Sequence, residues 1–171
     1  GEIKERLKVF PLRFQPLKKY FRITTWTLEC PSGETNIYIL KGEIVASDII
    51  DQSEVEKYLE AKLGRKKLEI KWDHSDNLIH KFTVTGISRT DKPQELTIEW
   101  DGASSGVKKK GSSTIYIPPS GAFIVLDVKT QQGENQKIDI IFSDPVDPAQ
   151  ELDGLVYTTP VSATAASISN N

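Results

Sequence analysis

Two histidines are the first residues whose types and spacing suggest chemistry. His74 and His80 lie close together in the sequence, with Asp73 and Asp76 beside them. Imidazole and carboxylate groups are common metal ligands, but a metal site usually recruits several of them on one rigid frame, and the chain has no further histidine. We therefore interpret residues 73–77 as a polar turn, with His80 partly buried where the next strand begins.

Three aspartates in the C-terminal part form a second candidate. Asp144, Asp147 and Asp153 carry hard oxygen ligands of the kind that Ca²⁺ prefers. Two of them precede proline, and Asp-Pro pairs are common in turns because Asp bonds the local backbone and Pro fixes φ. The sequence therefore favours turns here and predicts no metal ligand.

Other chemical arrangements are weak. No Ser-His-Asp order, nucleophile elbow, phosphate-binding glycine loop or identifiable carboxylate pair is present. The single Cys30 rules out an internal disulfide and argues against structural zinc, so we expect a buried or half-buried strand residue. Lys108, Lys109 and Lys110 are expected to form a solvated loop tip. The sequence predicts that the chain is not an enzyme, with no catalytic residue and no cofactor.

The elements that would position these residues are mostly strands. Apolar and polar residues alternate with period two, which predicts antiparallel strands that bury one face and wet the other. The expected strands cover residues 21–28, 36–40 continued by 42–46 across a bulge, 68–72, 81–85 and 96–100. Regular strands separated by polar turns are typical of a sandwich, with Trp72 and Trp100 facing its core.

One helix is expected, at about 53–63. Val55, Tyr58, Leu59 and Leu63 would share one helix face. Asp51 or Ser53 would cap its first turn, and Gly64 would end it. Such an amphipathic helix should lie on a sheet.

Composition sets broad limits. The chain has 171 residues, of which 37% are hydrophobic and 27% charged, which suits one ordinary domain or two small ones. A net charge of −2 gives no general reason to expect binding to nucleic acid or an anionic membrane. Basic and aromatic residues mix in the first twenty positions, but Pro11 and Pro16 break this stretch into short extended pieces. No apolar run is long enough for membrane insertion by this fragment.

The chain divides into four predicted parts. Residues 1–20 form an extended connector, 21–119 a sandwich domain with one helix, 122–158 a second β unit, and 159–171 a disordered tail. Residues 118–121 read as a linker because two prolines and a glycine interrupt the strand pattern. The strands expected at 123–128 and 137–142 cannot close a sandwich alone. They either complete the first sheet or open a second unit that the chain contains only in part.

Three stretches, taken in order, carry a family resemblance. The first covers residues 40–42, 47–48 and 55–59; the second covers 70–72, 80–84, 86–89 and 96–102; the third covers 123–128, 141–145 and 152–156. Together they resemble the N-terminal region of large bacterial α2-macroglobulin-like lipoproteins. The resemblance extends over about residues 38–157.

The resemblance implies a scaffold made of Ig-like, macroglobulin-type β-sandwich domains. Members of that family are secreted to the periplasm, are often anchored to the envelope by a lipid, and are thought to trap proteases through a cleavable bait and, in many members, an internal thioester. The implied partners are neighbouring domains of the same chain and target proteases of the full-length protein. No thioester motif surrounds Cys30, so that chemistry is carried over to no residue here.

A second class of function stays open at this point. An independent cell-surface adhesion or glycan-binding module would need exposed aromatic rings as a platform. Tyr38, Tyr116 and Tyr157 are the residues that would supply it.

Overall fold

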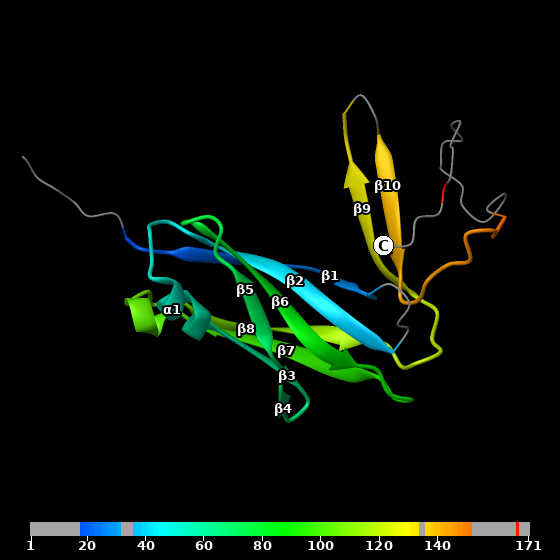
Figure 1. The fold of residues 1–171 in the computed structure, drawn as a ribbon, viewed down its shortest axis with the longest axis horizontal. Helices are drawn as coiled ribbons and strands as arrows, with labels where there is room; N and C mark the ends of the chain where they lie inside the picture. The colour runs from blue at the N-terminus through cyan, green and yellow to red at the C-terminus, as the bar shows by residue number, and fades with distance from the viewer. Residues whose placement is uncertain (1–17, 32–35, 134–135, 152–166, 168–171) are drawn as a thin grey trace, which may run out of the picture.

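The fold is a two-layer antiparallel β-sandwich followed by a β-hairpin (Figure 1). It is seen in a computed structural model that describes residues 18–31, 36–133, 136–151 and 167. Sheet A has the order β1-β2-β6-β5, and sheet B has the order β4-β3-β7-β8. The predicted mostly-β sandwich class is therefore confirmed. Most of the predicted tail and most of the predicted connector lie outside the described residues.

The element bounds are as follows. Sheet A consists of β1 (Phe21–Glu29), β2 (Ile37–Ala46), β5 (Ile70–Asp73) and β6 (Ile79–Ser88). Sheet B consists of β3 (Leu59–Leu63), β4 (Lys66–Lys67), β7 (Gln94–Asp101) and β8 (Lys110–Ile117). The hairpin consists of β9 (Val125–Gln131) and β10 (Lys137–Phe142). The helical pieces are α1 (Gln52–Val55), η1 (Glu56–Tyr58) and η2 (Ala103–Ser105).

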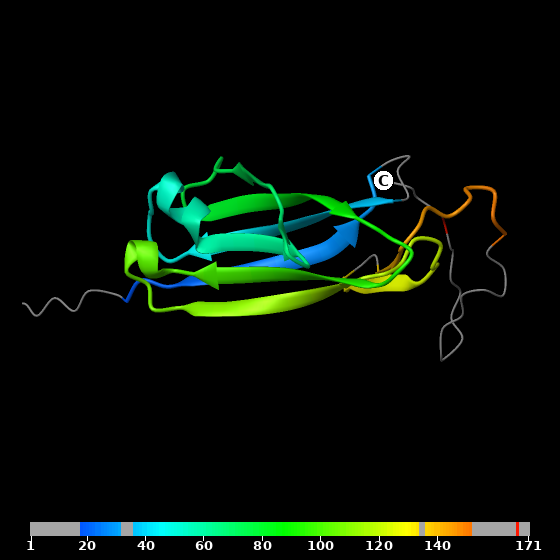
Figure 2. The ribbon, with the colours of Figure 1, turned by 90° about the horizontal axis from the view of Figure 1, so that it is seen from below.

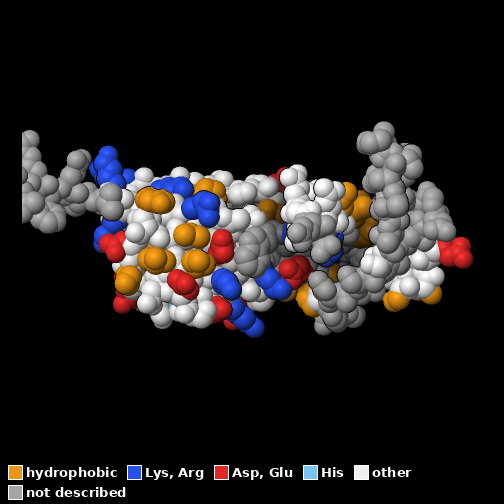
Figure 3. Space-filling view, turned by 90° about the horizontal axis from the view of Figure 1, so that it is seen from above, with side chains coloured by type: hydrophobic (Ala, Val, Ile, Leu, Met, Phe, Trp, Pro, Cys, Tyr) orange, Lys and Arg blue, Asp and Glu red, His pale blue; other side chains and the backbone are white. Residues whose placement is uncertain are grey.

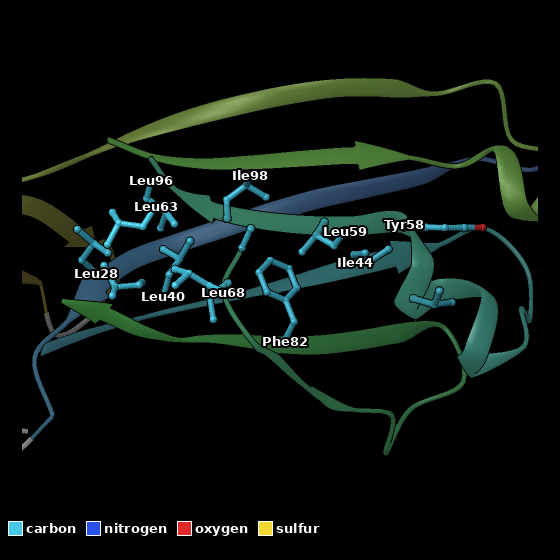
Figure 4. Packing of buried hydrophobic residues seen from close by; sticks show 14 of the residues in the cluster. Leu28, Leu40, Ile44, Tyr58, Leu59, Leu63, Leu68, Phe82, Leu96 and Ile98 are labelled. Carbon is cyan, nitrogen blue, oxygen red and sulfur yellow. The ribbon is translucent and has the colours of Figure 1, made fainter. Parts of the chain in front are cut away.

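The core fills the space between the two sheets, which lie one over the other (Figure 2). Alternate residues of β2 point inward, so Leu40 and Ile44 are fully buried. They lie in the same hydrophobic cluster as Phe82 of β6 and Ile98 of β7 (Figure 4). Period-two alternation on both sheets therefore produces one shared core, as predicted.

The predicted helix over about 53–63 is wrong in its second half. Asp51 caps a single turn by accepting a hydrogen bond from the Ser53 amide (2.8 Å), and the chain then passes through η1 into β3. Leu59 and Leu63 fit a helical period, but with Ala61 they also fit a strand period. Pairing with β7, whose Trp100 and Leu96 lie opposite the two leucines, decides for the strand.

Two further differences concern strands. Strand β8 begins at Lys110, where the sequence predicts a solvated loop tip. The Ser- and Thr-rich sequence of this strand gives little apolar signal. Strand β2 runs unbroken through Gly42, and register shifts occur instead near Tyr38 and between Thr25 and Leu28. These register shifts arise from the pairing of strands, so residue types alone do not predict them.

The two tryptophans pack as predicted on the core side of their strands. Trp72 and Trp100 are half-buried and contact the hydrophobic cluster. The opposite, outer face of sheet A is mostly polar, with hydrophobic side chains gathered towards the end where β1 begins (Figure 3). None of the helices in the described parts of the chain has the length and apolar character needed to cross a membrane.

Gly42 is required where β1, β2 and β6 lie side by side. A Cβ built at this position would lie 2.6 Å from the Thr24 carbonyl oxygen and would overlap the ring of Phe82. The oxygen belongs to the backbone of the adjacent strand, so it cannot move without shifting the sheet. Glycine therefore leaves the space that the Phe82 ring fills.

We expect Gly42→Ala to lower the free energy of unfolding by about 1–3 kcal/mol, because overpacking forces strands and side chains apart. Chemical denaturation would measure the change. Ser112→Ala on the exposed face of β8 is the control, with an expected change within about 0.5 kcal/mol. Adding Phe82→Leu to the Gly42→Ala background should offset part of the clash. An unchanged midpoint for Gly42→Ala would show that the contact is not limiting.

Candidate functional site

The most elaborate polar site is a joint between the sandwich and the hairpin, centred on Arg89. This residue directly follows β6, and its side chain is completely buried. Its Nη1 donates to Oδ1 of Asp144 (2.6 Å) and its Nη2 to Oδ2 (3.2 Å), which makes a bidentate ion pair. Asp144 lies just beyond β10, so the pair connects the two parts of the fold.

The same guanidinium also binds backbone carbonyl groups of the predicted linker. Its Nε donates to the Pro118 oxygen (3.3 Å), and its Nη2 donates to the oxygens of Pro119 (2.7 Å) and Ala122 (3.2 Å). The Ser120 amide donates in turn to the oxygen of Thr90 (2.7 Å). A planar group with five N–H donors can serve several acceptors at once, and here it fixes the linker on the sandwich.

Tyr38 and Ser143 complete the joint. The Tyr38 hydroxyl donates to the backbone carbonyl oxygen of Ser143 (2.7 Å). The Arg89 guanidinium carbon lies 5.1 Å from the centre of the Tyr38 ring. Ser143 is fully buried, and its hydroxyl accepts from the Ile124 amide (2.9 Å) and lies 2.7 Å from the Ala122 oxygen. Strand β2, the linker and the end of β10 therefore meet in one hydrogen-bonded network.

The electrostatics of the joint favour the ionised pair. Burial raises the pKa of Asp144, but hydrogen bonds from Arg89 and Ser143 outweigh this effect and hold the pKa below its ordinary value. Burial also lowers the pKa of Arg89, and the hydrogen bond to Asp144 more than compensates. Burial raises the pKa of Tyr38 to about 12, so its hydroxyl stays protonated as a donor. Such a network stabilises a geometry and offers no unoccupied nucleophile or base.

The two histidines form a second polar cluster at the other end of β6. His80 is buried, and its Nδ1 lies 2.9 Å from Nδ1 of His74. Nε2 of His74 lies 3.3 Å from Oε1 of Glu56 on η1. The predicted turn is present: Asp73 accepts from the Ser75 amide (3.0 Å), and Asp76 accepts from the amides of Leu78 and Ile79 (2.7 and 3.0 Å).

The aspartates considered for Ca²⁺ do not come together. Asp144 binds Arg89 and Ser143, whereas Asp147 forms a turn by accepting from the Ala149 amide (2.9 Å). Asp153 lies outside the described residues. Across the parts of the chain that the structure describes, no group of three or more His, Cys, Asp or Glu residues is arranged to hold a metal ion.

The remaining candidates take structural positions. Cys30 is half-buried against the core, as expected, but it directly follows β1 and is not itself a strand residue. Lys109 is not simply part of a solvated loop tip, because its Nζ donates to the backbone oxygen of Phe21 (2.8 Å) and so ties the loop before β8 to β1. Tyr38 cannot belong to an exposed aromatic platform, because it is fully buried in the joint. Tyr116 is 54% exposed, and Tyr157 lies outside the described residues.

Sequence reasoning missed the role of Arg89. The residue stands after an alternating strand and before a polar turn, where a solvated arginine is the ordinary expectation. Its partners lie 29 to 55 positions further along the chain. The only local signal was the position of Asp144 before a proline, which the turn interpretation already explained.

Comparisons with known proteins add no assignment. A scan against protein-family models found no match to the chain. Searches of curated proteins and of solved structures found no match either. The function must therefore be argued from the residues and the geometry.

We expect Arg89→Gln to release the hairpin from the sandwich. Breaking one side of a buried ion pair costs about 3 kcal/mol, so amide protection in β9 and β10 should fall roughly 100-fold. Hydrogen exchange followed by NMR would measure it. Lys41→Gln is the control: it removes a pair with Glu29 (2.5 Å) in which both side chains are about 40% exposed, so the change should stay below about 1 kcal/mol.

The outcome also tests the predicted boundary at residues 118–121. Loss of protection confined to the hairpin means that the linker separates two units. An equal loss throughout both sheets would mean one cooperative unit.

Acid should open the same joint. Because the folded-state pKa of Asp144 is below its unfolded value, the carboxylate stabilises the joint fully above about pH 4. That contribution is lost as the pH falls through the folded-state pKa. Protection of the hairpin should therefore decrease in the wild type as the pH is lowered below about 4. Asp144→Asn should show weak protection already at pH 6 and no such decrease; a decrease of equal size in this variant would assign the effect to another carboxylate.

Proposed function

We propose that the chain is a non-catalytic scaffold segment of a large bacterial α2-macroglobulin-like envelope protein that traps proteases. The observation that carries the proposal is the Arg89 joint. A buried, bidentate ion pair with carbonyl contacts holds the hairpin at a defined position on the sandwich. A joint of this kind has a structural role, because it sets the direction in which the chain continues.

The joint and the family resemblance rest on the same residues. Arg89 closes the stretch 86–89, and Ser143 with Asp144 stands in the stretch 141–145, both of which carry the resemblance. These residues are far apart in sequence but bond one another in the fold. The residues that carry the resemblance are thus also the residues that hold the hairpin on the sandwich, which supports the proposal.

The hairpin itself supports a continuing chain of domains. Val128 and Ile138 are 53% and 56% exposed, and Phe123 stacks on Phe142 with ring centres 4.9 Å apart. An isolated two-stranded hairpin is marginally stable, and three or more strands with an apolar face are needed for independence. We assign β9 and β10 to a second Ig-like, macroglobulin-type unit that neighbouring parts of the full-length chain complete.

The proposal extends to location and partners. The full-length protein would lie in the periplasm or cell envelope, anchored by a lipid outside this segment. The direct partners of this segment would be neighbouring domains of its own chain. Target proteases would be partners of the full-length protein.

A second candidate function is supported by one surface feature. A groove of about 450 Å³ lies between β1, β8 and β9, and the exposed Tyr116 lines it together with Asp127 and Lys129. An aromatic ring beside polar side chains is a common way to bind sugars. Binding to a glycan array that Tyr116→Ala abolishes would favour an independent adhesion module.

The scaffold proposal predicts that the isolated chain protects no substrate from proteases. Purified chain would be mixed with a panel of proteases, and cleavage of a large protein substrate would be followed with and without EDTA. The full-length protein, expressed from its complete reading frame, is the matched comparison and should protect the same substrate. A full-length variant with Arg89→Gln should trap less efficiently at unchanged expression.

Two results would overturn the proposal. Stoichiometric protection of the substrate by the isolated chain would place inhibition in this segment itself. A complete reading frame that ends shortly after residue 171 would leave no trapping domains for the segment to position.

A further inference from the structure

The sequence contains two histidines, and the fold brings them into contact. They lie on opposite sides of the β5–β6 turn: His74 directly follows β5, and His80 lies in β6. His80 is 1% exposed, and the side chain of His74 is 11% exposed. Histidine is the side chain whose ordinary titration falls between pH 5 and 8. The pair is therefore the principal site in this chain that responds to mild acid.

The hydrogen-bond partners of His74 and His80 indicate which nitrogen of each ring carries the proton. Oε1 of Glu56 accepts from Nε2 of His74 (3.3 Å), so Nδ1 of His74 presents a lone pair. Nδ1 of His80 must then carry the proton that bridges the 2.9 Å gap. Nε2 of His80 is buried without a hydrogen-bond partner, which is tolerable for a lone pair and costly for an N–H group.

Further charges surround the pair. Asp73 ends β5, Asp76 lies in the turn, and Lys81 of β6 interacts with both aspartates. Burial and the charge of His74 lower the pKa of His80, and Asp76 opposes them in part. With Glu56 on η1, these are the charged groups beside the pair, and burial disfavours a charge on the inner ring, His80.

The element that the pair secures is a weak one. Strand β5 has four residues and lies at the edge of sheet A, paired only with β6. The ring centre of Trp72, in β5, lies 5.7 Å from that of Phe82. The Trp72 ring also stacks on the His74 ring, with ring centres 5.6 Å apart. The imidazole contacts therefore join β5, η1 and the buried face of β6.

We propose that His74 and His80 form an acid-sensitive latch that holds edge strand β5 on sheet A and releases it below about pH 6. The first added proton binds Nδ1 of His74, which then donates to His80 while Nε2 still donates to Glu56. The proton of His80 moves to its Nε2. A second proton puts N–H groups on both facing Nδ1 atoms, which breaks the contact and drives His80 towards water.

Hydrogen exchange at several pH values tests the latch in the whole chain, with EDTA present to keep metal ions from the rings. The open state binds one more proton, so the protection factors of β5 amides should fall about tenfold per pH unit below about pH 6. Amides in the centre of β7 should keep theirs. Long-range ¹H–¹⁵N spectra at pH 7.5 should show His74 protonated on Nε2 and His80 on Nδ1.

Two variants separate the pair from burial alone. His80→Gln places a neutral amide opposite His74 and should abolish the pH dependence in β5. His74→Gln keeps the buried His80 but removes the second ring, and it should reduce the dependence by at least half. If His80→Gln does not fold, the His74→Gln variant and the wild-type spectra still test the latch.

Three outcomes would overturn the latch: protection in β5 that is independent of pH, an unchanged slope in His74→Gln, or spectra in which Nε2 of His80 carries the proton at pH 7.5. The proposal is independent of the scaffold function, because the Arg89 joint lies at the other end of β6 and contains no histidine. Failure of the latch therefore leaves the scaffold proposal as it stands.

Discussion

A guanidinium group removed from water needs partners for each of its N–H groups, and this requirement organises the junction around Arg89. Asp144 supplies the opposite charge, and the linker supplies carbonyl oxygens at defined positions. Any displacement of the hairpin would move Asp144 away from Arg89 and leave a buried charge uncompensated. The orientation of the hairpin follows from that cost.

The same reasoning explains why the joint differs from the other ion pairs. Lys57 and Glu54, or Lys62 and Glu99, pair on exposed strand and helix surfaces, where water competes and side-chain entropy opposes the contact. Such pairs contribute little to the choice of structure. At Arg89 the alternative to the native contact is an unpaired charge away from solvent, which gives specificity in addition to stability.

Strand β6 connects two polar sites of opposite character. His80 lies near its start and Arg89 follows its end, so roughly 30 Å of extended chain separates them. Arginine keeps its charge at every relevant pH, whereas histidine changes charge in mild acid. A permanent charge suits the joint that fixes the hairpin, and a titratable ring suits the edge strand at the opposite end.

The amino-acid sequence by itself determined the strands with clear alternation, a helix cap at Asp51 or Ser53, the partial burial of Cys30 and the core side of Trp72 and Trp100. These features depend on neighbouring residues, because the period of the hydrophobic pattern and local capping act within a few positions. Only the tertiary structure decided that residues 59–63 form a strand, since pairing with β7 overrode a helical period. Contact between His74 and His80, and between Arg89 and Asp144, also required the fold. These contacts form because distant segments of the chain bury the side chains together. Neither residue type nor spacing in the sequence predicts which charged side chain will be buried.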